Sequence, residues 1–154
     1  MPRILVDADS CPISEDIIAI AHKRGLPARF YSRQPHPRLE GRQGIELIAC
    51  GEDFDETDDT LVDDIHPQDI VITADIRLAR RALDAGSIAL GYRGPWTADN
   101  IGQALAHAKL GALMREKGLP VEHTRKARSK SKLDLGKFRH DLNTSIDRTL
   151  ETNS

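Results

Sequence analysis

The architecture of this chain is first indicated by Ile4-Leu5-Val6-Asp7-Ala8-Asp9-Ser10-Cys11-Pro12, an apolar run that ends in two carboxylates before a helix begins. Residues two apart on an extended chain point to the same side, so Asp7 and Asp9 are predicted to lie together at the end of a buried strand. Two like charges held this close repel each other. A fold keeps such a pair mainly to hold a cation, a shared proton or a nucleophile.

Length and composition bound the possible classes of protein. The chain has 154 residues, of which 39% are hydrophobic and 30% charged, as expected of one globular domain with a tail. Its apolar runs are far shorter than the roughly 20 residues of a membrane span, and its charged amino terminus does not resemble a signal peptide. Two cysteines are too few for a disulfide framework. We therefore expect a cytoplasmic protein with no membrane partner, and the sequence leaves its oligomeric state open.

Strand and helix patterns alternate along most of the chain, which predicts an α/β fold. The expected strands cover residues 3–6, 28–31, 45–49, 69–73 and 87–90, and the expected helices cover residues 13–24, 57–65, 75–85 and 98–117. This order favours βαβ units and a mainly parallel five-stranded sheet between two helical layers, a three-layer α/β/α fold. Apolar residues at helical spacing predict a further amphipathic helix over residues 135–150. We expect an α/β domain over residues 1–120, and a basic linker with a C-terminal helical extension over residues 121–154.

Carboxylates follow two of the predicted strands. In open parallel sheets, ligands bind beyond the carboxyl ends of the strands, where the strand order reverses. If the first and fourth strands are neighbours there, Asp7, Asp9 and Asp75 converge, and the helix over residues 57–65 adds Asp58 or Asp59. Oxygen ligands without His or Cys suit Mg²⁺ or Mn²⁺ rather than zinc. Such ions activate water and stabilise charge in phosphodiester hydrolysis.

Two of these residues also have purely structural interpretations. Asp75 stands where an N-cap of the following helix is expected, and capping and metal binding are compatible. The Thr73 hydroxyl could donate to a ligand carboxylate or a phosphate, although threonine also simply favours strands.

Positive charge is concentrated elsewhere in the chain. Arg93 lies between Tyr92 and Trp96, an arrangement that can contact a phosphate and stack a base, although Trp96 could equally pack onto the domain. A basic run further on is typical of a nucleic-acid-binding tail that contacts the phosphate backbone, or of a solvated linker. The run consists of Arg125, Lys126, Arg128, Lys130 and Lys132.

The motifs closely resemble one known family. The segments Val6 to Pro12, Phe54 to Val62 and Asp69 to Ala79 are similar to the bacterial YaiI/YqxD family of uncharacterised proteins, and the resemblance covers Ile4 to about Gly118. That family looks like a branch of the PIN-like and NYN-type nuclease superfamily. The resemblance implies Asp7, Asp58 and Asp75 as the core acidic set, both catalytic and metal-binding, with Asp9 as an additional metal ligand.

The leading interpretation is a PIN-like nuclease that depends on Mg²⁺ or Mn²⁺ and acts on RNA more readily than on DNA. An alternative is a catalytically silent nucleic-acid-binding or adaptor domain, because the last acidic position of many PIN-like nucleases has no match in Leu90 to Gly94. A third is a phosphatase of the haloacid-dehalogenase type, with Asp7 as nucleophile and Asp9 as acid. Against the third, Cys11 stands where that class has Thr or Val.

Overall fold

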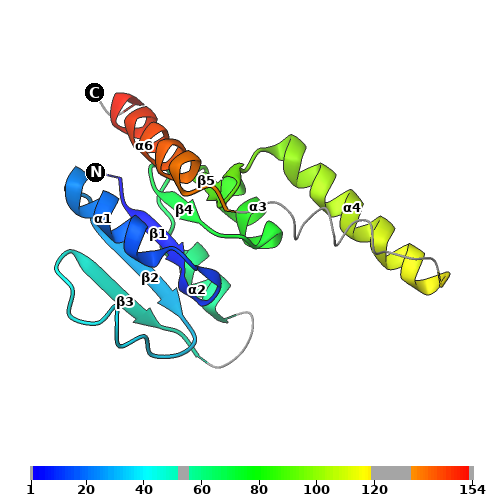
Figure 1. The fold of residues 1–154 in the computed structure, drawn as a ribbon, viewed down its shortest axis with the longest axis horizontal. Coiled ribbons are helices and arrows are strands. Elements are labelled where there is room, and N and C mark those ends of the chain that lie inside the picture. Colours follow the sequence, from blue (N-terminus) through cyan, green and yellow to red (C-terminus); the bar gives the residue numbers. More distant parts are fainter. Residues whose placement is uncertain (1, 52–55, 119–132, 153–154) are drawn as a thin grey trace.

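The computed structural model describes residues 2–51, 56–118 and 133–152 (Figure 1). Helices and strands alternate along the described chain, as the sequence pattern predicts. The strands are β1 (Ile4–Asp7), β2 (Ala28–Ser32), β3 (Ile45–Ala49), β4 (Ile70–Ile72), β5 (Ile88–Gly91) and β6 (Gly94–Pro95). The helices are the 3₁₀ turn η1 (Ala8–Ser10), α1 (Ser14–Arg24), α2 (Glu56–Asp64), α3 (Ile76–Asp84), α4 (Ala98–Glu116) and α6 (Leu135–Thr152).

The strands form one sheet in the order β3-β2-β1-β4-β5-β6. All neighbours are parallel except β5 and β6, and Val6 of β1 lies in register between Phe30 of β2 and Ile72 of β4. The strand order reverses between β1 and β4, so the condition for convergence of the carboxylates is met. The predicted parallel sheet is confirmed, and β6 extends it to six strands. Two residues are too short to carry a strand pattern, which is why sequence periodicity missed β6.

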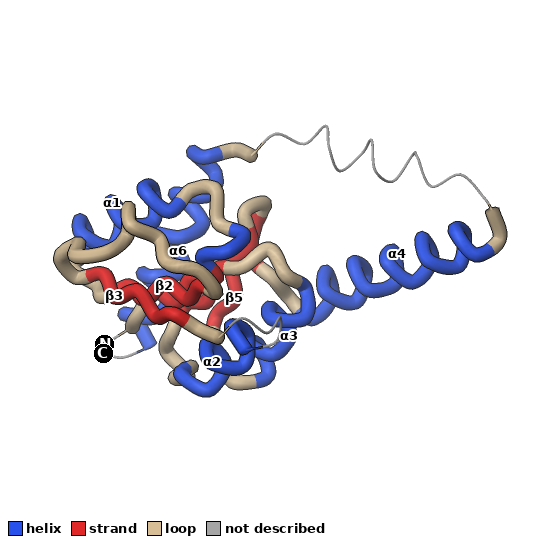
Figure 2. The backbone as a smooth tube through the Cα atoms, turned by 90° about the horizontal axis from the view of Figure 1, so that it is seen from below, coloured by secondary structure: helices blue, strands red, loops and turns tan. Residues whose placement is uncertain are grey.

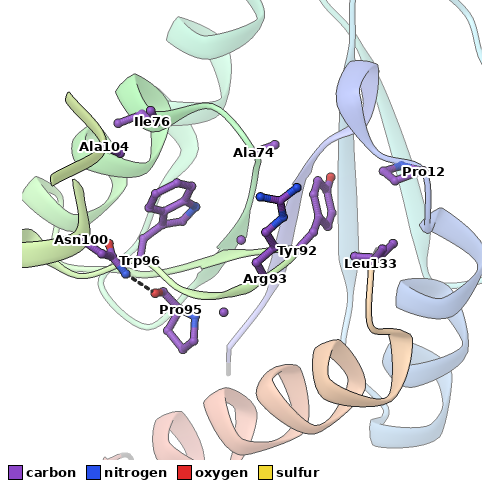
Figure 3. Close-up of a pocket in the computed structure, with 12 residues that line it drawn as sticks. Pro12, Ala74, Ile76, Tyr92, Arg93, Pro95, Trp96, Asn100, Ala104 and Leu133 are labelled. Atoms are coloured by element: carbon purple, nitrogen blue, oxygen red, sulfur yellow. Dashed lines mark hydrogen bonds between the residues drawn. The ribbon is translucent and has the colours of Figure 1, made fainter. Parts of the chain in front are cut away.

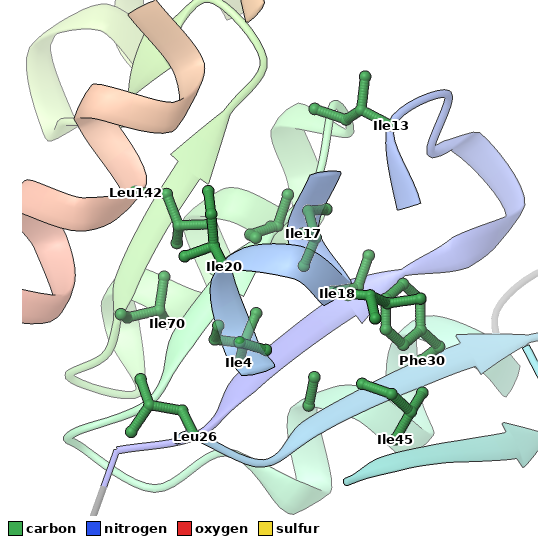
Figure 4. Close-up of a cluster of buried hydrophobic side chains, with 14 of the residues drawn as sticks. Ile4, Ile13, Ile17, Ile18, Ile20, Leu26, Phe30, Ile45, Ile70 and Leu142 are labelled. Carbon is green, nitrogen blue, oxygen red and sulfur yellow. The ribbon is translucent and has the colours of Figure 1, made fainter. Parts of the chain in front are cut away.

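Helices cover both faces of the sheet. Alternate residues of β1 supply the two cores: Ile4 and Val6 pack with α1, while Leu5 packs with α2 and α3. Figure 2 shows α1 and α6 on one side of the strands and α2 and α3 on the other. Figure 4 shows the α1 side, where Ile17 and Ile20 meet the sheet. The fold is therefore the expected three-layer α/β/α arrangement.

The C-terminal helix α6 belongs to this core. Phe138, Leu142 and Ile146 are at most 1% exposed and lie in the same cluster as β1 and α1. Ion pairs add to the contact with α1, joining Arg139 to Asp16 at 2.6 Å and Arg24 to Asp147. The expected C-terminal helix is present, and it completes one layer of the domain.

Helix α4 packs only at its beginning. Ile101 is buried and Leu105 packs against the α2/α3 core, but Leu110 and Leu113, further along the helix, are 54% and 45% exposed. Figures 1 and 2 both show α4 running outward from the body of the molecule. None of the helices in the described ranges has the length and apolarity needed to cross a membrane.

Candidate functional site

The predicted acidic residues gather at the carboxyl edge of the sheet, where β1 and β4 are neighbours. A cavity of about 730 Å³ opens there. We call it the acidic cavity, because its lining includes Asp7, Asp9, Asp58 and Asp75. The strand-order reversal next to it is the usual place for a ligand in an open α/β sheet.

Asp7 is the most enclosed of the four carboxylates. It ends β1 on the α2/α3 side of the sheet and is only 7% exposed. Thr73, just after β4, donates its hydroxyl to Asp7 Oδ2 at 3.2 Å and accepts the Asp75 backbone N–H at 3.0 Å. One buried hydroxyl thus connects the side chain of Asp7 to the backbone of Asp75. Thr73 donates to a carboxylate of the site, as one of its two interpretations from sequence predicts.

Asp75 caps helix α3, as its position in the sequence predicts. Its Oδ1 accepts the N–H of Arg77 at 2.8 Å and that of Leu78 at 3.5 Å. Both of these cap bonds use the same oxygen of the carboxylate. The second oxygen can therefore face a ligand while the cap is kept, so capping does not exclude a ligand-binding role.

Asp9 reaches the acidic cavity by a different route from the one expected. The prediction that it shares a strand face with Asp7 is wrong, because β1 ends at Asp7 and η1 begins at Ala8. Its carboxylate accepts the Ser32 hydroxyl at 2.9 Å and the backbone N–H of Arg33 at 3.0 and 3.2 Å. Asp9 thereby joins the turn after β1 to the end of β2. Both of its oxygens are engaged, which weighs against the acid role that a haloacid-dehalogenase phosphatase needs.

Helix α2 contributes Asp58 rather than Asp59. Asp58 lines the acidic cavity, whereas Asp59 forms an ion pair with Arg81 of α3 at 2.8 Å. Thr57, beside Asp58, is 3% exposed, and its hydroxyl has no hydrogen-bond partner among the described residues. Buried polar groups are rarely left unsatisfied, so this hydroxyl indicates a partner such as a water or ligand.

Cationic side chains border the carboxylates. Arg33, from the end of β2, and Arg77, in the first turn of α3, both line the acidic cavity. Arg33 Nε lies 3.7 Å from Asp9 Oδ2. Guanidinium groups beside a carboxylate site offer contacts for a phosphate group. The sequence analysis does not single out Arg33, although its position just after a predicted strand, at the carboxyl edge of the sheet, was an available signal.

The donor set fits a hard cation with an incomplete protein shell. Within the described ranges, no group of three or more His, Cys, Asp or Glu side chains is gathered closely enough to hold a metal ion. Mg²⁺, however, usually keeps several waters and takes one or two carboxylates together with substrate phosphates. The four Asp carboxylates of the lining, together with a Thr57 hydroxyl that has no hydrogen-bond partner among the described residues, suit that kind of site better than a closed cage.

The predicted nucleic-acid-binding residues fall into two groups. Arg93 lies in the turn between β5 and β6 and lines a second, neighbouring cavity, shown in Figure 3. The basic run lies outside the described residues: Arg125, Lys126, Arg128, Lys130 and Lys132.

Comparison with known proteins places the chain in a family. The model of the family described as "Uncharacterized BCR, YaiI/YqxD family" matches residues 5–148. A UPF0178 protein of Parvibaculum lavamentivorans is 40% identical over 119 residues, covering 77% of this chain and 78% of the relative. UPF0178 proteins of Jannaschia sp. and of Rhodopseudomonas palustris strain TIE-1 are 34% and 37% identical, covering 94% and 96% of this chain and 92% of each relative. No solved structure gives a significant match. The chain belongs to the YaiI/YqxD family.

Proposed function

We propose that this protein is a phosphodiesterase dependent on Mg²⁺ or Mn²⁺ that acts on nucleic acid, with RNA as the preferred substrate. One observation carries the proposal: carboxylates from β1, α2 and the start of α3 line a single cavity at the reversal of strand order. The resemblance to PIN-like nucleases supports the same assignment of Asp7, Asp58 and Asp75.

Each residue has a distinct part in this proposal. Asp7 and Asp75 would hold the ion, with Asp58 facing them from α2 and Asp9 fixing the turn that follows β1. When bound, the ion supplies an activated water and charge stabilisation on the phosphate oxygens. Thr73 keeps the Asp7 carboxylate oriented through its 3.2 Å hydrogen bond. Arg33 and Arg77 would bind the phosphates that flank the cleaved bond.

The test is cleavage of single-stranded RNA by the purified protein in Mn²⁺ or Mg²⁺, with EDTA as the blank. Asp7→Asn and Asp75→Asn should each lower the rate more than about 100-fold, because even outer-shell partners of a metal cost 10–100-fold. Asparagine keeps the cap on α3, so the Asp75 variant isolates the loss of charge. Asp59→Asn is the matched control. Asp59 neighbours Asp58 on α2 but forms an ion pair with Arg81 of α3, so this variant should keep full activity.

The alternatives give different results in the same assay. A silent nucleic-acid-binding domain would bind RNA without metal-dependent cleavage. A phosphatase would release phosphate from a monoester and be trapped by beryllium fluoride at Asp7. Cleavage that persists in both the Asp7 and the Asp75 variant would refute the proposal.

A further inference from the structure

A second cavity of about 550 Å³ opens beside the acidic cavity. Its lining includes Tyr92, Arg93 and Trp96 from the β5–β6 hairpin, and we call it the hairpin cavity (Figure 3). Ala74 and Ile76 line both cavities, so the two are neighbours. We infer that the hairpin cavity binds a nucleobase whose adjoining phosphate is directed toward the acidic cavity. This inference rests on the proposed function and specifies the part of the substrate that the protein holds.

The indole of Trp96 is fixed in place before any ligand arrives. Its Nε1 donates to the Thr73 carbonyl oxygen at 3.0 Å. Gly91 lies directly against the ring, because a Cβ at that position would come within 2.9 Å of Nε1. A rigid aromatic surface loses little entropy when a base stacks on it. The same Thr73 donates its hydroxyl to Asp7, so one residue positions the Trp96 ring and a carboxylate of the acidic cavity.

Arg93 supplies the positive charge beside this surface. Its side chain is exposed, and Figure 3 shows the guanidinium between the rings of Trp96 and Tyr92. Lys137 of α6 donates to the Arg93 carbonyl oxygen at 3.0 Å and thereby holds the turn of the hairpin. A guanidinium next to an aromatic ring suits a base with an attached phosphate better than an uncharged apolar ligand.

The cavity has few polar atoms with which to distinguish one base from another. Trp96 Nε1 is engaged, and the Tyr92 hydroxyl is buried. The Asn100 amide donates to the Pro95 carbonyl at 2.8 Å and accepts the Thr97 N–H at 2.8 Å. Base recognition that depends on stacking is tolerant of sequence. The four common bases should therefore bind with affinities within about fivefold of one another.

Trp96 is the only tryptophan of the chain, so its fluorescence reports directly on the hairpin cavity. The full chain in EDTA would be titrated with AMP, GMP, CMP and UMP, and with ribose 5-phosphate as the ligand that lacks a base. We expect a saturable change with every nucleotide and none with ribose 5-phosphate. Free N-acetyltryptophanamide in the same titrations corrects for absorption by the nucleotides.

Two variants keep the fluorescent probe and alter its surroundings. Arg93→Ala should weaken nucleotide binding at least about fivefold through the lost charge. Gly91→Ala should weaken it similarly, because the new methyl group displaces the indole. Asp59→Asn serves as the unchanged control, and thermal unfolding shows whether each variant is folded.

A further arm identifies the source of the base. A pentaribonucleotide that binds at least tenfold more tightly than the mononucleotides indicates a nucleic-acid strand, and equal affinities indicate free nucleotides. The inference is overturned if no saturable change occurs, or if ribose 5-phosphate gives the same response. The fluorescence titration requires neither a metal ion nor turnover. If the protein binds nucleotides but does not cleave RNA, the base site therefore stands and the proposed nuclease activity fails. If it cleaves RNA but nucleotides leave the Trp96 fluorescence unchanged, only the base site is overturned.

Discussion

At the scale of single residues, Tyr31 carries a titratable group into the core of the sheet. The side chain is fully buried, and its hydroxyl donates to Asp64 Oδ2 at 2.6 Å. Burial and this hydrogen bond raise the pKa of Tyr31 above that of an exposed phenol. The folded state therefore strongly favours the protonated form.

The raised pKa predicts a loss of stability at alkaline pH. A group whose pKa is higher in the folded state adds to the free energy of unfolding. This stabilisation is fully present below the pKa of the group in the unfolded chain, about 10 for tyrosine, and is lost as the pH rises above that value. The free energy of unfolding should fall by about 1.4 kcal/mol for each pH unit in that range through this group. In Tyr31→Phe this component should vanish, measured by urea unfolding at several pH values. Parallel curves for the two proteins above pH 10 would contradict the prediction.

The sequence predicted the residue types of the site better than their orientation. The residue pattern alone left Asp58 and Asp59 as equals, and only the family resemblance favoured Asp58. The rotation of a helix about its axis depends on its packing, here against α3, where Arg81 forms an ion pair with Asp59. The pattern placed Asp9 on the strand because nothing local shows where extended backbone gives way to a 3₁₀ turn. Asp75 was predictable in both roles, since a cap position depends only on neighbouring residues.

At the scale of elements, α4 shows how tertiary contacts divide one helix. Ile101 and Leu105 near its start pack against the core, whereas Leu110 and Leu113 further along are exposed. Ile101→Ala should lower the free energy of unfolding by about 2–4 kcal/mol, as expected for a buried site. Leu110→Ala, on the exposed half, should change it by less than about 0.5 kcal/mol. Urea unfolding of both variants tests the contrast, and equal losses would show that the outer half of α4 is packed in solution.

The other element boundaries follow closely from sequence, mostly within one residue. Buried strands such as β1 are continuous apolar runs, and glycines such as Gly25, in a left-handed conformation, end helices at positions that are visible in the sequence. The sequence could not predict how the hairpin after β5 folds back. The hairpin depends on the absence of a Cβ at Gly91, which leaves room for the Trp96 ring, and on the hydrogen bond from Lys137 of α6 to the Arg93 carbonyl oxygen.

At the scale of the whole molecule, α6 links the two ends of the chain. The sequence predicts it as an extension after a basic linker. Its apolar spacing indicates that one face is buried, but not which part of the molecule covers that face. In the structure that face completes the layer beside α1, and Lys137 holds the hairpin that lines the second cavity. Stability and the candidate binding surface therefore depend on the same helix.

Removing α6 should accordingly abolish cooperative folding. Burial of Phe138, Leu142 and Ile146 contributes roughly 1.5–3 kcal/mol for each side chain, and the three together match much of the 5–15 kcal/mol that stabilises a typical domain. A chain of residues 1–118 should lack a sigmoidal unfolding transition in urea, and Phe138→Ala in the full chain should lower the free energy of unfolding by about 3–5 kcal/mol. Leu150→Ala, exposed on the same helix, is the matched control and should change it by less than about 0.5 kcal/mol. A cooperative transition of the shortened chain near the wild-type midpoint would instead establish residues 1–118 as an independent domain, with α6 as an accessory.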